Sequence, residues 1–305
     1  MKLEVKNLTK SFGEKEVLHG ISFDVEGGKA LGLLGRNGAG KTTTIRIIMD
    51  VFHANSGEIF LDGKRFNPNE HLIGYLPEER GLYPKKKVSE QLVYLGRLRG
   101  LSKAEAKKNT DKWLKRLQVS QYTDVKLETL SKGNQQKVQL ASTLVCEPEI
   151  VILDEPFSGL DPVNSKILQD VVTELIEEGR IVIFSSHQMS YVEEFCEDIA
   201  IINNGEIALS GDIVDIKAEY GKNQLIIAAV GMGAEELAEK LKTSCEDTLS
   251  VTGIHKDGVI VKNIHELSGN ALIKEIMNAD IEIASFDSYR PSLNDIFVKA
   301  VGGDR

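Results

Sequence analysis

The sequence has few cysteines, no long hydrophobic run and no excess of basic residues. Its three cysteines, Cys146, Cys196 and Cys245, lie far apart and form no Cys-x-x-Cys pair, which argues against a zinc site and for a reducing cytoplasm. The longest apolar runs, such as 150–153 and 225–230, have the length of strands, whereas a membrane-spanning helix needs about 18 consecutive apolar residues. The 46 acidic residues outnumber the 37 basic ones and give a net charge of −9, so no nucleic-acid partner is expected. Because no apolar run is long enough to span a membrane, a role at a membrane would require a partner chain.

The 305 residues are enough for two domains. Strand-like runs at 3–5, 16–18 and 21–25 open the chain, and a helical stretch covers about residues 88–145. Buried strands then alternate with helices, which is typical of a parallel sheet covered by helices. For residues 1–220 we expect an α/β domain with a mixed sheet, an antiparallel N-terminal part and a helical insert.

A different pattern starts after Tyr220-Gly221, and residues 221–305 are expected to form a second, accessory domain. Its predicted elements follow the order strand, helix, strand, strand, helix, strand, and a helix over 292–301 comes last. This order matches a ferredoxin-like sandwich and predicts a small α+β domain. Shortly before the boundary, Asn204-Gly205 lies between two strand-like runs and predicts a β-hairpin.

A glycine-rich turn lies between a buried strand at 30–34 and a helix that starts at Lys41. It fills every fixed position of G-x-x-x-x-G-K-[ST], in which glycines let backbone N–H groups converge on phosphates at the positive end of a helix. Lys41 can reach the β- and γ-phosphates, and the Thr42 hydroxyl can bind Mg²⁺. The residues expected to contact ATP here are Gly35, Arg36, Asn37, Gly38, Ala39, Gly40, Lys41, Thr42 and Thr43.

A second apolar strand, at 150–153, ends in Asp154 and Glu155. Neighbouring strand residues point to opposite faces, so both carboxylates can approach a nucleotide only because the strand ends there. Asp154 would hold Mg²⁺ directly or through water, and Glu155 would polarise the attacking water. A strand that ends in Asp-Glu is weak evidence alone, but together with the glycine turn it indicates a site that hydrolyses a nucleotide.

Three further motifs lie in order around this strand. Residues 130–136 read Leu-Ser-Lys-Gly-Asn-Gln-Gln, residues 158–162 read Ser-Gly-Leu-Asp-Pro, and residues 185–187 read Ser-Ser-His. With the glycine turn, this order resembles the P-loop ATP-binding cassette (ABC) ATPases over about residues 1–220. The chain is most similar to bacterial subunits of sodium-export and drug-export type, which are single cassettes with a small C-terminal extension and a separate membrane permease.

The resemblance implies a role for several residues. Phe12 is similar to the aromatic residue that stacks on adenine. Ser131 and Gly133 match the signature loop, which in this family closes over the γ-phosphate held by the other protomer of a dimer. Asp161 would link the two sites across that dimer, and His187 would contact the γ-phosphate and position the catalytic carboxylate and water.

The sequence departs from the family pattern in two places. The signature has Lys132 for the usual glycine and Asn134 for the usual glutamine, but Ser131 and Gly133 are kept, so activity is expected. Glu78 stands where the family usually has glutamine, and it offers Mg²⁺ a charged oxygen in place of a neutral one. Glu78 would therefore either bind the metal more firmly or raise the cost of bringing the γ-phosphate close.

These inferences predict the ATP-hydrolysing subunit of an ABC transporter of export type, peripheral at the cytoplasmic face of the membrane. Its cofactors would be ATP and Mg²⁺, and its partners a second copy of the chain and a membrane permease. Two alternatives stay open. One is a soluble ABC-type factor acting on ribosomes or DNA, although translation-type factors usually carry two cassettes and repair types carry a coiled coil or zinc elements. The other is a regulatory ATPase in which residues 224–305 sense a ligand.

Overall fold

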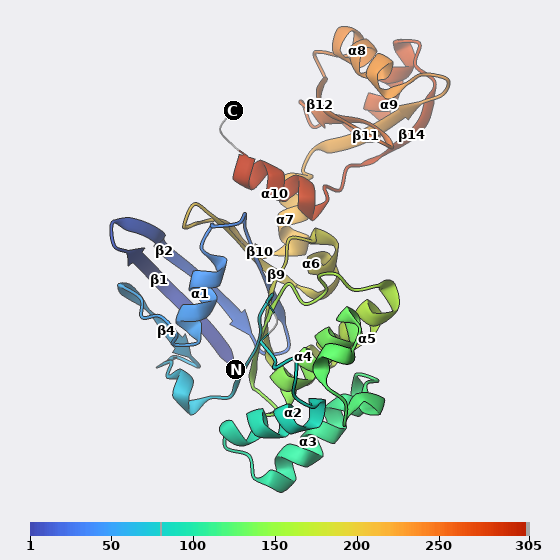
Figure 1. Ribbon diagram of the computed structural model, residues 1–305. Coiled ribbons are helices and arrows are strands. Elements are labelled where there is room, and N and C mark those ends of the chain that lie inside the picture. The colour runs from blue at the N-terminus through green and yellow to red at the C-terminus, as the bar shows by residue number, and fades with distance from the viewer. Residues whose placement is uncertain (80, 303–305) are drawn as a thin grey trace. The chain divides into compact units, whose positions relative to one another are not determined.

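The structure is a computed structural model that describes residues 1–79 and 81–302 (Figure 1). The chain forms two compact units. Among the described residues, the first consists of Met1–Ile213 together with Lys299–Gly302, and the second of Val214–Val298. No helix among the described residues combines the length and the apolar character needed to cross a membrane.

The first unit begins with an antiparallel sheet in the order β2-β1-β4-β5. Its strands are β1 (Lys2–Phe12), β2 (Lys15–Glu26), β4 (Ser56–Leu61) and β5 (Lys64–Arg65). The predicted N-terminal strands were too short, because β1 continues through Asn7, which has a φ of 51°, and through shifts of register on both sides of Leu8. Alternation of buried and exposed residues along β2 lets one face of this sheet enter the core.

The second sheet of this unit has the order β10-β9-β3-β8-β7-β6. Its strands are β3 (Ala30–Leu34), β6 (Ile73–Leu76), β7 (Ile150–Asp154), β8 (Ile181–Ser185), β9 (Asp198–Asn203) and β10 (Glu206–Asp212). Four neighbouring pairs, β9·β3, β3·β8, β8·β7 and β7·β6, are parallel, and every residue of β3, β7 and β8 is buried, as expected for strands covered on both faces. The hairpin predicted at Asn204-Gly205 is confirmed, since β9 and β10 pair across it in antiparallel fashion.

Helix α1 (Lys41–Ile48) packs between the two sheets (Figure 1). Its buried Ile45, Ile47 and Ile48 belong to one hydrophobic core with residues of β1, β2, β7 and β8. Helices α5 (Pro162–Glu177) and α6 (Met189–Phe195) also belong to this unit, as do the short 3₁₀ helices at Pro68–Glu70, Ser120–Tyr122 and Leu127–Thr129.

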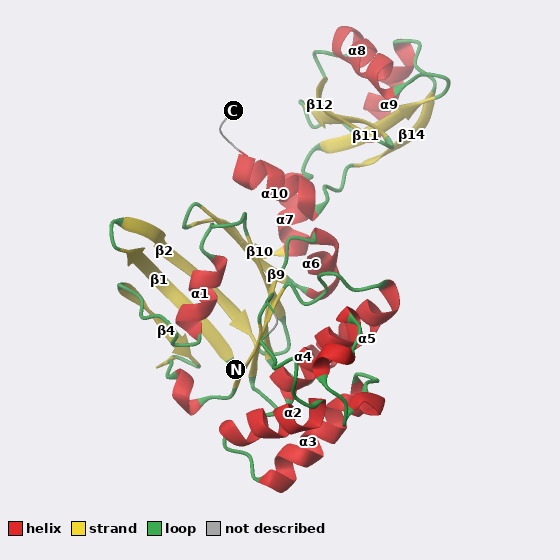
Figure 2. Ribbon diagram, in the orientation of Figure 1, coloured by secondary structure: helices red, strands yellow, loops and turns green. Residues whose placement is uncertain are grey.

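The helical insert consists of α2 (Val88–Leu98), α3 (Lys103–Arg116) and α4 (Lys132–Leu144), which gather at one end of the unit (Figure 2). The charged helix α3 is held to the core by polar contacts. Trp113 donates its indole N–H to Glu147 Oε1 at 3.0 Å, and Glu147 also pairs with Arg180 at 2.8 Å. Arg116 donates from Nε and Nη2 of its guanidinium to the carboxylate of Glu174 on α5. Bidentate pairs of this kind fix orientation as well as position.

The second unit contains β11 (Gln224–Ala229), α8 (Ala234–Ser244), β12 (Leu249–His255), β13 (Gly258–Asn263), α9 (Gly269–Asn278) and β14 (Ile283–Ser288). The strands form an antiparallel sheet in the order β12-β13-β11-β14, and α8 and α9 cover one face of it (Figure 2). This is the strand order of a ferredoxin-like sandwich, so the predicted fold class is confirmed here too. Helix α7 (Ile213–Tyr220) precedes this sheet, and α10 (Leu293–Gly302) follows it.

The close approach at Gly205 yields a first testable prediction. Its φ is +81°, and a Cβ there would lie 2.5 Å from the Val17 carbonyl oxygen. Gly205→Ala should therefore lower the free energy of unfolding by about 2–4 kcal/mol, from backbone strain plus overlap. The matched control is Gly63→Ala, because Gly63 has a φ of +75° and nothing within 4 Å of its Cβ position. Denaturation followed by Trp113 fluorescence should show a smaller loss for this control, and equal losses would contradict the account.

Candidate nucleotide site

The loop 35–40 links β3 to α1, and its glycines allow it to pack closely against neighbouring strands. Gly35, Gly38 and Gly40 have φ values of 153°, 82° and 121°, in the region that favours glycine. A Cβ on Gly35 would lie 2.4 Å from the Ile202 carbonyl oxygen, and one on Gly40 would lie 2.6 Å from Leu18 Cδ2. The loop is thus held between β9 and β2, and the backbone N–H groups at the start of α1 have no side-chain cap. Such a helix start attracts anions.

Lys41 is the first residue of α1 and curls its side chain back over the loop. Its Nζ donates to the carbonyl oxygen of Gly35 at 2.6 Å and to that of Arg36 at 3.3 Å. Burial lowers the pKa of Lys41, while Asp154, Glu155 and Glu78 act in the opposite direction. The ammonium is therefore available to neutralise an anion that replaces its two carbonyl partners.

Asp154 and Glu155 both reach the cavity beside Lys41, in spite of being neighbours at the end of β7. Asp154 is the last strand residue, and Glu155 takes a left-handed φ of 50°, which turns the chain. Both side chains are largely buried. Burial raises the pKa of Asp154, and the nearby carboxylates of Glu78 and Glu155 act in the same direction. Tyr75 donates its hydroxyl to Asp154 Oδ2 at 3.4 Å.

The Glu155 carboxylate is fixed by the residues after β8. The backbone N–H of His187 donates to Glu155 Oε1 at 2.7 Å, and the Ser186 hydroxyl donates to Oε2 at 3.1 Å. The His187 ring lies on the same carboxylate, with Nδ1 at 2.7 Å from Oε1, while much of the ring stays exposed. A carboxylate held in this way can accept a proton from a water molecule without first having to reorient.

A cavity of about 700 Å³ brings most of the predicted nucleotide residues together. It is lined by Lys15, Val17, Arg36, Asn37, Gly38, Gly40, Lys41, Thr42, Thr43, Glu78, Asp154, Glu155 and His187. Sequence reasoning did not find Lys15 and Val17, which come from β2. It quoted Ser186 within its motif but gave it no role. Gly35 and Ala39 shape the loop from behind and do not line the cavity.

The side chains with oxygen atoms in this cavity are suitable ligands for Mg²⁺. Thr42, Asp154 and Glu78 all line it, and hard oxygen ligands such as hydroxyl and carboxylate groups are those that Mg²⁺ prefers. Within residues 1–79 and 81–302, no three His, Cys, Asp or Glu side chains converge into a metal site of their own. Mg²⁺ is usually held by one or two protein ligands, several waters and nucleotide phosphates.

Three further predicted residues, Ser131, Gly133 and Asp161, lie outside this cavity, at the starts of α4 and α5. Ser131 caps α4 by accepting a hydrogen bond from the Asn134 N–H at 3.4 Å. Asp161 caps α5 and accepts from the backbone of Asn164 at 2.9 Å, a bond that lowers the pKa of Asp161. A Cβ on Gly133 would lie 2.7 Å from Asn164 Nδ2, so both helix starts meet at Asn164.

The two unusual signature residues and Phe12 have their own surroundings. Lys132 is exposed, and the Asn134 side chain donates to the Tyr122 hydroxyl at 3.3 Å. Phe12 also lies outside the cavity, and its ring meets Phe52 edge-on at a centroid distance of 5.2 Å. The stacking of Phe12 on adenine stays a prediction.

A P-loop cassette with an adjacent carboxylate pair is the class of protein that this fold and site define. A family model described as "ABC transporter" matches residues 18–158, and one described as "ATP-binding protein DrrA1-3-like, C-terminal domain" matches residues 211–301. The chain belongs to the ATP-binding proteins of ABC transporters, a family that hydrolyses ATP.

Individual proteins extend this similarity over nearly the whole chain. The uncharacterized ABC transporter ATP-binding protein YhaQ of Bacillus subtilis (strain 168) is 39% identical over 98% of both chains. The linearmycin resistance ATP-binding protein LnrL of the same organism is 32% identical over 98% of both chains. A solved structure described as an ATP binding subunit of an ABC transporter has a TM-score of 0.67 and 31% identity, covering 72% of this chain and 94% of its own.

The position of Lys41 leads to a second prediction. Lys41→Ala removes the ammonium from the loop and should weaken ATP binding about 10- to 100-fold, the range expected when a charge-assisted hydrogen bond is lost. Titration calorimetry measures this directly. The control is Lys64→Ala, which replaces an exposed lysine on β5. This variant should bind ATP like the wild type. Unchanged ATP affinity in Lys41→Ala would contradict the assignment of the phosphate loop.

Proposed function

We propose that this chain powers export through a separate membrane permease, by coupling ATP-driven closure of a homodimer to a movement of that permease. The observation that carries the proposal is the single cavity in which Lys41, Asp154 and Glu155 meet. Similarity to LnrL over nearly the full length supports export, and its description as a resistance protein favours drug export over sodium export. The same similarity argues against a ribosome- or DNA-acting factor.

At the site, Lys41 and the N–H groups at the start of α1 bind the phosphates. Mg²⁺, held by Thr42, Asp154 and Glu78, supplies charge neutralisation when it is bound. Glu155 takes the proton of the attacking water, and His187 keeps that carboxylate oriented. These contributions are positioning and electrostatic stabilisation, which make up most of the catalysis of phosphoryl transfer.

Dimer formation is supported by the position of the signature residues outside the cavity of their own chain. Ser131 and Gly133 do not line the cavity of their own chain, although the start of α4 carries a hydroxyl and no acidic residue in its first turn. The positive end of a helix suits a phosphate, so a second copy can present it to the γ-phosphate. Asp161, at the neighbouring helix start, would then lie at the interface.

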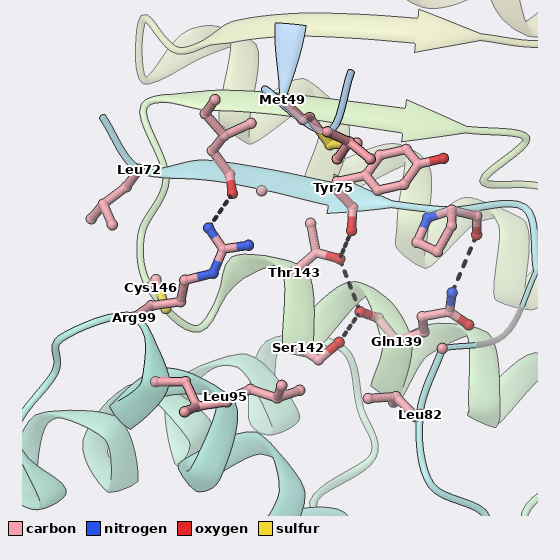
Figure 3. A pocket seen from close by; sticks show the side chains of 16 residues that line it. Met49, Leu72, Tyr75, Leu82, Leu95, Arg99, Gln139, Ser142, Thr143 and Cys146 are labelled. Atoms are coloured by element: carbon pink, nitrogen blue, oxygen red, sulfur yellow. Dashed lines mark hydrogen bonds between the residues drawn. The ribbon is translucent and has the colours of Figure 1, made fainter. Parts of the chain in front are cut away.

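A second cavity, of about 450 Å³, supports the proposed contact with the permease (Figure 3). We call it the docking groove. It lies among α2, α4, β6 and the end of α1, and its apolar lining includes Met49, Leu72, Leu82, Leu95 and Leu98. Apolar side chains beside a groove mark an interaction site, and the predicted partner is a helix of the permease.

Replacing the water-activating carboxylate is the direct test of the hydrolytic role. Glu155→Gln is nearly isosteric but cannot accept a proton, so ATP binding should persist while turnover falls about 100-fold or more. Both are measured on the purified protein, by titration calorimetry and phosphate release. The control is Glu128→Gln, which replaces an exposed glutamate. This variant should keep wild-type turnover. Near wild-type hydrolysis by Glu155→Gln would remove Glu155 from the catalytic role.

The docking groove is tested at Leu98, whose side chain is 63% exposed. Leu98→Lys should leave folding and ATP binding intact, because the residue lies at the end of α2, where a cation is tolerated. It should, however, reduce recovery of the permease when the tagged chain is purified from detergent-solubilised membranes. Met277→Lys, an exposed position on α9, is the matched control. Undiminished permease recovery with Leu98→Lys would rule out this groove.

A further inference from the structure

The edge strand β6 is covered by side chains of the helical insert. Its inner edge pairs with β7, and its outer edge pairs with no strand among residues 1–79 and 81–302. On that outer edge, alternate carbonyl groups accept hydrogen bonds from side chains. Arg99 Nη1 donates to the Ile73 carbonyl oxygen at 3.3 Å, and the Thr143 hydroxyl donates to that of Tyr75 at 3.2 Å (Figure 3). The insert therefore takes the place of a further strand along this edge.

The pattern continues past the end of the strand through one residue, Gln139 on α4. Its Nε2 donates to the Pro77 carbonyl oxygen at 3.2 Å and to the Glu79 carbonyl oxygen at 3.2 Å. Glu78 lies between these two peptide groups, and its side chain lines the nucleotide cavity. Because β6 ends at Leu76, no sheet hydrogen bond fixes this segment.

The Gln139 side chain is well suited to fixing a position. It is only 4% exposed, and Figure 3 shows it on the face of α4 that is turned towards β6. Ser142 donates its hydroxyl to the backbone carbonyl oxygen of Gln139, and the single hydroxyl proton of Thr143 is shared between that carbonyl and the one of Tyr75. When the backbone is anchored on both sides of a residue, only the side-chain torsions of that residue stay free to vary. Gln139 lines the docking groove, whereas Glu78 lines the separate nucleotide cavity.

We propose that Gln139 is a positioning residue for Glu78, which ties the backbone on both sides of that carboxylate to α4 and so sets its place beside the nucleotide. This inference rests on the proposed function, since it takes Glu78 to act on the metal bound with ATP. Sequence reasoning had no signal for it, because Gln139 lies far along the chain from residues 77–79.

The test compares ATP binding with and without Mg²⁺ by titration calorimetry. Gln139→Met keeps the length of the side chain and removes the donor. It should leave the affinity for ATP alone unchanged and reduce the enhancement by Mg²⁺ about three- to tenfold, as expected for the loss of hydrogen bonds that hold a ligand in place. Glu78→Ala should also reduce the enhancement. Gln139→Met should then add nothing in the Glu78→Ala background.

Hydrogen exchange gives a readout that needs neither metal nor nucleotide. In Gln139→Met the backbone amides of Glu78 and Glu79 should exchange faster, while those of β7 stay protected. Ser142→Ala is the matched control, because Ser142 lines the same groove but donates only within α4. It should behave as wild type in both measurements.

The outcomes separate the two proposals. A wild-type protein that fails to bind ATP would overturn the proposed function. A wild-type protein that binds ATP, with Gln139→Met unchanged in Mg²⁺ enhancement, would overturn only the positioning role. An equal effect of Gln139→Met with and without the Glu78 side chain would also overturn it, because Gln139 would then act independently of Glu78.

Discussion

The nucleotide cavity depends on a loop that can approach two strands only because it carries no side chains at its contact points. Gly35 lies too close to the backbone of β9 for a Cβ, and Gly40 lies against Leu18 of β2 with a φ of 121° that favours glycine. This packing sets the start of α1 and therefore the place of Lys41. The parallel strands β3, β7 and β8 end at the same edge of the sheet, so the residues that follow them meet at this loop. The site is thus a consequence of strand direction combined with the glycine loop.

The charges in the cavity explain why a divalent cation belongs to the expected chemistry. Glu78, Asp154 and Glu155 place three carboxylates in the cavity near Lys41, and Lys15 and Arg36 also line it. Burial raises the pKa of Asp154 and lowers that of Lys41, so both groups are held where charge is costly. Nucleotide phosphates add further negative charge, which a divalent cation offsets. Glu78 adds a negative charge to the cavity that the usual amide would not add.

Local patterns predicted the parts of the structure that local chemistry determines. The glycine loop, the buried strand ending in Asp154 and the hairpin at Asn204-Gly205 were all visible as short motifs, and the order of elements indicated both folds. The length of β1 was not visible, because its irregular register around Leu8 breaks the alternation that marks a strand. Gln139 was also missed, because its role depends on contacts between distant parts of the chain.

The central claim, a pair of composite ATP sites in a homodimer, is tested most directly by mixing two inactive variants. Ser131→Arg obstructs the signature and Lys41→Ala damages the phosphate loop, so each homodimer should lack ATPase activity. Half of the dimers in an equal mixture carry one intact site, and about a quarter of wild-type turnover should return, with dimer formation followed by light scattering. Full ATPase activity of Ser131→Arg alone, in a protein that dimerises normally, would contradict the claim.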